Sequence, residues 1–175
     1  MNALCSSTMG ARLVLVIALV GACDDGSGFA GDYESVAFAR GMGSCGGERT
    51  AEPVPGNDLF FRLADVDMLV AYFPCTAVGT CDDLHDLTRS FGAAKDGDTA
   101  WAGYLATAIP GTTCTLTYRV RRLSRDGDGH VVITTETFRD TDDTLTGSAC
   151  DQQAAADRGT AMPCIEDSEL VAEDR

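Results

Sequence analysis

CTLTYRVRRLSR, residues 114–125, is the stretch that decides the fold class of this chain. Its apolar and polar residues alternate, so that Cys114, Leu116, Tyr118 and Val120 are separated by Thr115, Thr117, Arg119 and Arg121. Successive side chains of a β-strand point to opposite faces, so this alternation predicts a strand with one core face and one polar face. Residues 126–129, DGDG, tolerate positive φ and predict a turn, and residues 130–139, HVVITTETFR, predict the return strand of a hairpin.

Further strands are predicted on the N-terminal side of this hairpin. They lie at residues 33–40, 58–63 and 66–73, and residues 95–98, KDGD, predict a turn before a strand at 99–107. Helical signals are confined to residues 151–157, which end near Gly159, and to a turn around residues 82–87. The chain is therefore predicted to be mainly β, an antiparallel meander of about seven or eight strands. Such a meander hides its edges by closing, which favours an up-and-down barrel, with a β-sandwich as the alternative.

The N-terminal segment differs in composition from the rest of the chain. Its first 22 residues contain no Asp or Glu, although the whole chain has 27 acidic and 13 basic residues. Residues 13–20, LVLVIALV, have the length of a signal-peptide core and fall short of the roughly 20 residues that span a bilayer. We expect residues 1–22 to be a signal peptide, residues 23–32 a tether and residues 33–175 a single β-rich domain. Met1 and Met9 are both candidate start sites. A signal peptide begins with a short positively charged region, and Arg12, the first basic residue, lies close behind Met9.

Residues 20–23, VGAC, resemble a bacterial lipobox, in which an aliphatic residue and two small residues precede a cysteine. The resemblance implies cleavage after Ala22, lipidation of Cys23 with chains such as palmitate, and a membrane anchor in the cell envelope, outside the cytoplasm. Whether that membrane is the inner or the outer one stays open. The alternative is an ordinary secretory signal that leaves Cys23 as a free or disulfide-bonded thiol.

The exported part of the chain contains six further cysteines: Cys45, Cys75, Cys81, Cys114, Cys150 and Cys164. An even number of cysteines behind an export signal predicts a disulfide framework. Six cysteines allow fifteen full pairings, and the connectivity stays open; the short span favours a Cys75–Cys81 bond, and nesting would add Cys114–Cys150 and Cys45–Cys164. No Cys-x-x-Cys occurs, and the two histidines lie outside metal-ligand spacing, so no metal site is predicted.

The tether leads into Gly31, Asp32 and Tyr33, a Gly-x-aromatic entry. Together with the strand order that follows, this entry resembles the small lipocalin-like lipoproteins of bacteria. The resemblance implies a barrel whose interior can hold a small apolar ligand. Residues for lining such an interior are aromatic or aliphatic and lie on predicted strands: Trp101, Tyr104, Leu116, Tyr118 and Val120.

Composition and motifs exclude several function classes. A formal net charge of −14 argues against nucleic acid as a partner. No Gly-x-Ser-x-Gly elbow, dinucleotide fingerprint or Walker loop occurs, so no catalytic residue and no cofactor are predicted. Three acidic clusters, at residues 82–86, 125–129 and 140–143, are interpreted as a helix start, a turn and a solvated loop rather than as metal sites.

These observations predict a non-enzymatic, lipid-anchored protein that binds a small apolar ligand or an envelope protein. The alternative is a structural or interaction lipoprotein with a filled core. A cavity in the interior would favour the first hypothesis, and a close-packed interior would favour the second.

Overall fold

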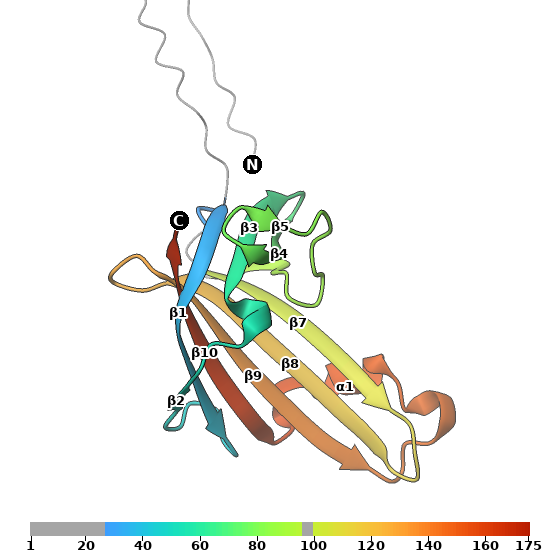
Figure 1. The fold of residues 1–175 in the computed structure, drawn as a ribbon. Helices are drawn as coiled ribbons and strands as arrows, with labels where there is room; N and C mark the ends of the chain where they lie inside the picture. Colours follow the sequence, from blue (N-terminus) through green and yellow to red (C-terminus); the bar gives the residue numbers. More distant parts are fainter. Residues whose placement is uncertain (1–26, 96–99) are drawn as a thin grey trace, which may run out of the picture.

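The structure is a computed structural model that describes residues 27–95 and 100–175. Its strands within these residues are β1 (Gly31–Met42), β2 (Thr50–Glu52), β3 (Phe60–Val66), β4 (Leu69–Ala77), β5 (Thr80–Cys81), β6 (Ala93–Lys95), β7 (Ala100–Ile109), β8 (Cys114–Arg125), β9 (Val131–Asp142) and β10 (Cys164–Asp174). One α-helix, α1 (Gln152–Arg158), lies between β9 and β10, as Figure 1 shows. Residues 1–26, including the expected signal peptide and Cys23, lie outside the described part.

The strands form one antiparallel sheet in the order β5-β4-β3-β1-β10-β9-β8-β7-β6, and β2 pairs only with β1. The first long strand therefore lies beside the last one. The path ends at β5 and β6 and does not close along its length. A single isolated bridge, between Val70 of β4 and Phe91 just before β6, connects the two sides of the sheet. The mainly β, antiparallel prediction is confirmed, whereas the sheet is not a fully closed barrel.

Several element boundaries differ from the prediction. The turn between β3 and β4 lies at Asp67 and Met68, not at residues 64–65, because Asp67 adopts a positive φ of 52° that an Asp tolerates. Residues 82–87 form no helix. The last strand, β10, was not predicted, because its acidic residues mask its alternation. The α1 helix is confirmed, with Asp151 accepting a capping hydrogen bond from the Ala154 amide at 2.9 Å. The predicted turn residues 96–98 lie outside the described residues.

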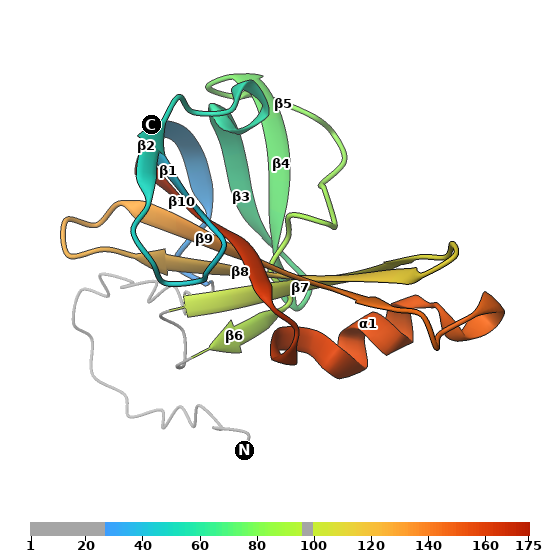
Figure 2. The ribbon, with the colours of Figure 1, turned by 90° about the horizontal axis from the view of Figure 1, so that it is seen from below.

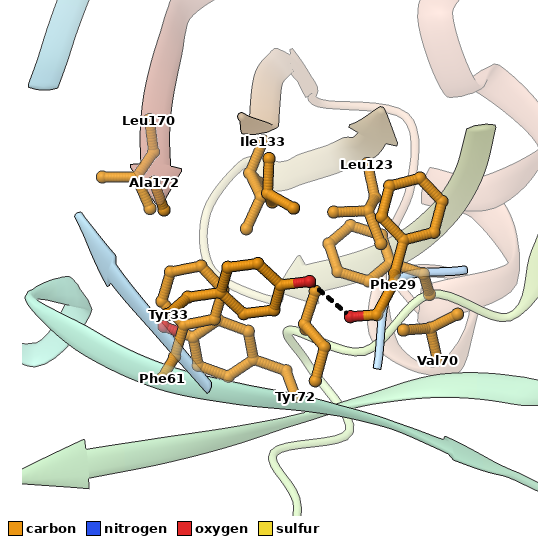
Figure 3. Packing of buried hydrophobic residues seen from close by; sticks show 12 residues of the cluster. Phe29, Tyr33, Phe61, Val70, Tyr72, Leu123, Ile133, Leu170 and Ala172 are labelled. Atoms are coloured by element: carbon orange, nitrogen blue, oxygen red, sulfur yellow. Dashed lines mark hydrogen bonds between the residues drawn. The ribbon is translucent and has the colours of Figure 1, made fainter. Parts of the chain in front are cut away.

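The main core lies where the sheet curls back on itself. Figure 2 shows β3 and β4 standing across β8 and β9. Tyr33, Phe61 and Tyr72 stack in a row, with ring centroids 5.2 and 5.0 Å apart, and each is at most 1% exposed. Leu123 and Ile133 pack against them from the other side, as Figure 3 shows. This end of the sheet interior is filled by side chains.

A second core lies on the opposite side of β7 and β8, under α1. Its buried members include Leu116, Val120 and Phe138 of the sheet and Ala155 of the helix. The Cys114–Cys150 disulfide joins the start of β8 to the segment that precedes α1. Because α1 spans only Gln152–Arg158, most of its stability comes from this packing rather than from its own helix propensity.

All three predicted disulfides are present: Cys45–Cys164, Cys75–Cys81 and Cys114–Cys150. They tie the Gly-rich loop after β1 to β10, the end of β4 to β5, and β8 to the α1 region. Disulfides of this kind persist in oxidising compartments. No helix in the described residues is long and apolar enough to cross a membrane.

Candidate ligand-binding site

The long strands β8 and β9 have two faces of different character. We call the odd-numbered residues of β8 and β9 the front face and the even-numbered residues the back face. The register places Arg121 opposite Thr135 on the front face, and Tyr118 opposite Phe138 on the back face. The front face continues into the main core through Leu123, and the back face is covered by α1. The front face is therefore the inner side of the curled sheet.

Charge is divided unevenly between the two faces. The front face carries four arginines and no acidic residue, namely Arg119, Arg121, Arg125 and Arg139. The back face carries Arg122 together with Glu136, Asp140 and Asp142. Its acids are compensated, because Arg122 contacts Glu136 and Arg158 contacts both aspartates. Among the described residues, Arg119, Arg121 and Arg139 form no ion pair with any carboxylate.

Residues 86–92, which we call the crossing segment, contact β4 on one side and β7 on the other. On one side, the Tyr72 amide donates to Ser90 Oγ at 3.1 Å, and Phe91 exchanges two 2.9 Å backbone hydrogen bonds with Val70. On the other side, the segment passes so close to Gly103 that a Cβ there would lie 2.3 Å from the Ser90 carbonyl oxygen. A glycine is required at this crossing for steric reasons.

Arg121 lies beneath the crossing segment and is only 8% exposed. Its Nη1 donates a 2.6 Å hydrogen bond to the Arg89 carbonyl oxygen, and its guanidinium lies over the rings of Tyr72 and Phe91 at 5.4 and 5.2 Å. Burial lowers the pKa of Arg121 to about 10, while Tyr72 and Asp58 act in the opposite direction. Arg121 therefore remains a cation at neutral pH.

Arg89 belongs to a compensated cluster at the rim of the same region. Its Nη1 lies 2.9 Å from Asp58 Oδ1 and its Nε lies 3.2 Å from Asp86 Oδ2. The Tyr72 hydroxyl also donates to Asp58 at 3.1 Å. Burial opposes the charge of Arg89, but Asp58, Tyr72 and Asp86 raise its pKa above the ordinary value. The two acids of this rim are thus engaged by Arg89 and leave the two neighbouring β8 arginines without an ion-pair partner.

A polar cavity of about 320 Å³ is lined by residues of the crossing segment and of the front face. Its walls are Asp58, Asp86, Thr88, Arg89, Arg119, Arg121 and Thr135. This volume is at the lower end of the range for small-molecule sites. A larger cavity of about 490 Å³ shares Asp86 and Arg89 and adds less polar walls that include Leu59, Phe60 and Pro74. Two guanidiniums and a threonine hydroxyl in a confined polar space can bind a carboxylate or a phosphate by charge-assisted hydrogen bonds.

The structure places the five predicted ligand-lining residues on two different faces. Trp101 lies opposite Leu123 and packs on the main core. Leu116, Tyr118 and Val120 are on the back face in the second core, and Tyr104 is 59% exposed with its ring 6.1 Å from that of Tyr118. The apolar face of β8 is turned toward α1, so it is the polar face of this strand that lines the inner cavity.

The acidic cluster at the β8–β9 turn behaves as predicted for a turn. Ligand atoms of Asp126, Asp128 and His130 lie within 4.8 Å of one another. Asp126 Oδ1 accepts hydrogen bonds from the amides of Asp128 and His130 at 2.9 Å, and Oδ2 lies 3.0 Å from His130 Nδ1. This carboxylate is therefore used to shape the turn.

The other two acidic clusters differ from the prediction. Asp140 and Asp142 are not simply solvated, because Arg158 of α1 contacts both of them. In the region 82–86, Asp86 lines the cavity, whereas His85 packs edge-on against the Phe73 ring at a centroid distance of 5.7 Å. Tertiary contacts with Arg158 and Arg89 engage acids that sequence alone places at the surface.

Comparison of the chain with family models, with curated proteins and with solved structures finds no match. The role of the cavity is therefore inferred from its own residues. Sequence reasoning missed Asp58 and Arg89, which reach the site through long-range contacts. One feature of the sequence could have indicated this site: Arg119 and Arg121 place two cations on one face of a strand in a strongly acidic chain.

Proposed function

We propose that this protein is a lipid-anchored, non-enzymatic binding module outside the cytoplasm that holds a small anionic ligand in the 320 Å³ cavity. The observation that carries the proposal is the presence of Arg119 and Arg121 side by side, without a carboxylate partner among the described residues, in a chain of net charge −14. Asp58 and Asp86 also line this cavity, but both are paired with Arg89, so two cations remain without an ion-pair partner in the described part of the chain and are suited to an anion supplied from outside.

We further propose that the sheet works as an incompletely closed, lipocalin-like barrel. The adjacency of β1 and β10 and the bridge from Val70 to Phe91 support this. The interior has a filled apolar end and a polar end. An apolar ligand is disfavoured in this barrel because Tyr33, Phe61 and Tyr72 occupy the apolar end.

Membrane attachment is proposed through lipidated Cys23. The VGAC sequence and the disulfide framework support it, and acyl chains add about 0.8 kcal/mol of membrane affinity for each buried methylene. Expression of Cys23→Ser in a bacterial host that processes lipoproteins should release the protein to the soluble fraction or leave the precursor uncleaved. Unchanged membrane extraction and an unchanged mature mass would contradict the anchor.

The fluorescence of Trp101, the single tryptophan, tests ligand binding. Succinate is titrated as the anionic probe and decanol as the apolar probe, both at an ionic strength of about 0.15 M, where long-range attraction is screened. We expect a saturable change with succinate and none with decanol. Arg119→Gln should weaken succinate binding about tenfold or more, because it removes one charge-assisted hydrogen-bond donor.

Arg122→Gln is the matched control for Arg119→Gln, since Arg122 lies on the back face of the same strand and outside the cavity. It should bind succinate like the unmodified protein. A response to decanol alone would restore the apolar-ligand hypothesis. Absence of any saturable response would favour a structural or interaction role, which the filled apolar end of the interior also supports.

A further inference from the structure

The front face continues beyond the cavity toward the far ends of β8 and β9. Past Arg119 it carries Thr115, Thr117, Arg139 and Thr141. Figure 1 shows these ends of the strands running well past β3 and β4, and Figure 2 shows α1 on their other side. Arg139 is exposed, and Thr117 opposite it is half-buried. A ligand held in the cavity can therefore extend along the sheet.

Three of the four front-face arginines lie in a line along the strands, whereas Arg125 at the other end of β8 pairs with Asp174. Arg119 is two residues from Arg121 on β8, and Arg139 lies opposite Thr117, which is four residues from Arg121. At a rise of about 3.3 Å per residue, the line is roughly 13 Å long. On the neighbouring strand β10, Glu166 is paired in register with Thr137, and its carboxylate lies 3.6 Å from Arg40 Nε.

Hydroxyl groups surround this line of cations. Thr115, Thr117, Thr135 and Thr141 share the front face with the arginines. A threonine hydroxyl both donates and accepts hydrogen bonds, whereas a guanidinium only donates. The face thus suits a chain that carries hydroxyl groups between its anionic groups. A polyphosphate offers only hydrogen-bond acceptors. It could accept hydrogen bonds from these threonine hydroxyls, but it has no hydroxyl group to donate a hydrogen bond to their oxygens.

We propose that the ligand of this face is a linear acidic oligosaccharide with carboxylates on its sugar units. One carboxylate occupies the cavity at Arg119 and Arg121, and the chain runs along the front face so that a further carboxylate reaches Arg139. This inference rests on the proposed function, because it extends the same anion site. It adds the length and the chemical class of the ligand, neither of which the cavity alone specifies.

The test is a length series of one acidic sugar. Galacturonic acid and its linear dimer, trimer and tetramer are titrated into the full-length protein by isothermal titration calorimetry at about 0.15 M salt. We expect the dissociation constant to fall by about tenfold or more between the monomer and the longer oligomers, as one further charge-assisted contact forms. Arg139→Gln should remove this gain and leave the affinity for the monomer unchanged.

Two comparisons separate this inference from the proposed function. Arg119→Gln should weaken binding at every length, and Arg122→Gln on the back face should change nothing. Monomer binding that does not strengthen with length, or a length gain that survives Arg139→Gln, would overturn the inference and leave the anion site standing. Linear polyphosphate of equal charge binding as tightly as the trimer would overturn the saccharide assignment. Failure of both succinate and all uronates to bind would remove the proposed function itself.

Discussion

The two faces of β8 and β9 share the same strands and have opposite chemistry. The back face packs Leu116 and Val120 under α1, and its charges are compensated by Arg122 and Arg158. On the front face, Arg119 and Arg121 form no ion pair among the described residues, because the nearby Asp58 and Asp86 are paired with Arg89. Both faces contribute to a core, since Leu123 and Ile133 of the front face belong to the main core, but only the front face carries arginines without an ion-pair partner within the described residues. Substitutions on the two faces should therefore separate stability from binding.

Among substitutions on the two faces of β8 and β9, the largest effect is expected at the back-face disulfide, Cys114–Cys150. Replacing Cys114 and Cys150 together by Ala should lower the free energy of unfolding by about 4 kcal/mol, because the bond closes a loop with a sequence separation of 36. The same change at Cys75 and Cys81, with a separation of 6, should cost about 2 kcal/mol. Urea unfolding measures both. Equal losses would show that loop closure is not the main contribution of these bonds.

Leu116→Ala probes the apolar packing of the back face. Leu116 is fully buried, so the lost burial and the remaining cavity should reduce the free energy of unfolding by about 3 kcal/mol. Thr117→Ala, the next residue on the opposite face, is the control and should cost less than about 0.5 kcal/mol. Succinate affinity at 25 °C should be unchanged in the Leu116 variant. A fall in affinity would mean that the two faces are coupled.

Gly103→Ala tests the contact between β7 and the crossing segment. The added Cβ would lie 2.3 Å from the Ser90 carbonyl oxygen, so overpacking should cost about 2 kcal/mol and displace Arg89 from the cavity rim. Gly92→Ala is the matched control, since a Cβ there meets no atom within 4 Å. Thermal unfolding and succinate titration should both respond to the first change. A fully stable Gly103→Ala variant would contradict the close crossing.

The smallest effect is expected from pH. The cations of the cavity are guanidiniums, and even Arg121, whose pKa burial lowers to about 10, is protonated well above neutrality. Succinate affinity should therefore change less than about twofold between pH 6.5 and 8.5, and it should fall as pH rises through about 10, where Arg121 loses its charge. Titration calorimetry across this range measures the profile. A marked change between pH 6.5 and 8.5 would contradict an anion site made of guanidiniums.

Prediction from sequence succeeded where the signal is local. The alternation in residues 114–125 predicted β8, and Asp151 with Gly159 bounded α1. It failed for β10, whose acids obscure the buried Leu170 and Ala172. It also failed for the direction of the β8 faces, because an apolar face can be buried against a helix as readily as inside a barrel.

The sequence by itself determined the mainly β fold class, the presence of a disulfide framework and the alternation of the long hairpin, whereas the structure decided which cysteines pair. These follow from strand periodicity, cysteine number and turn chemistry, which act over short stretches of chain. Only the tertiary structure decided that α1 covers the apolar face of β8 and that residues 86–92 cross over Arg121. These arrangements depend on contacts between residues far apart in sequence. The strand register places Gly103 opposite Arg121, and the absence of a Cβ at Gly103 lets the backbone at Ser90 pass close to β7.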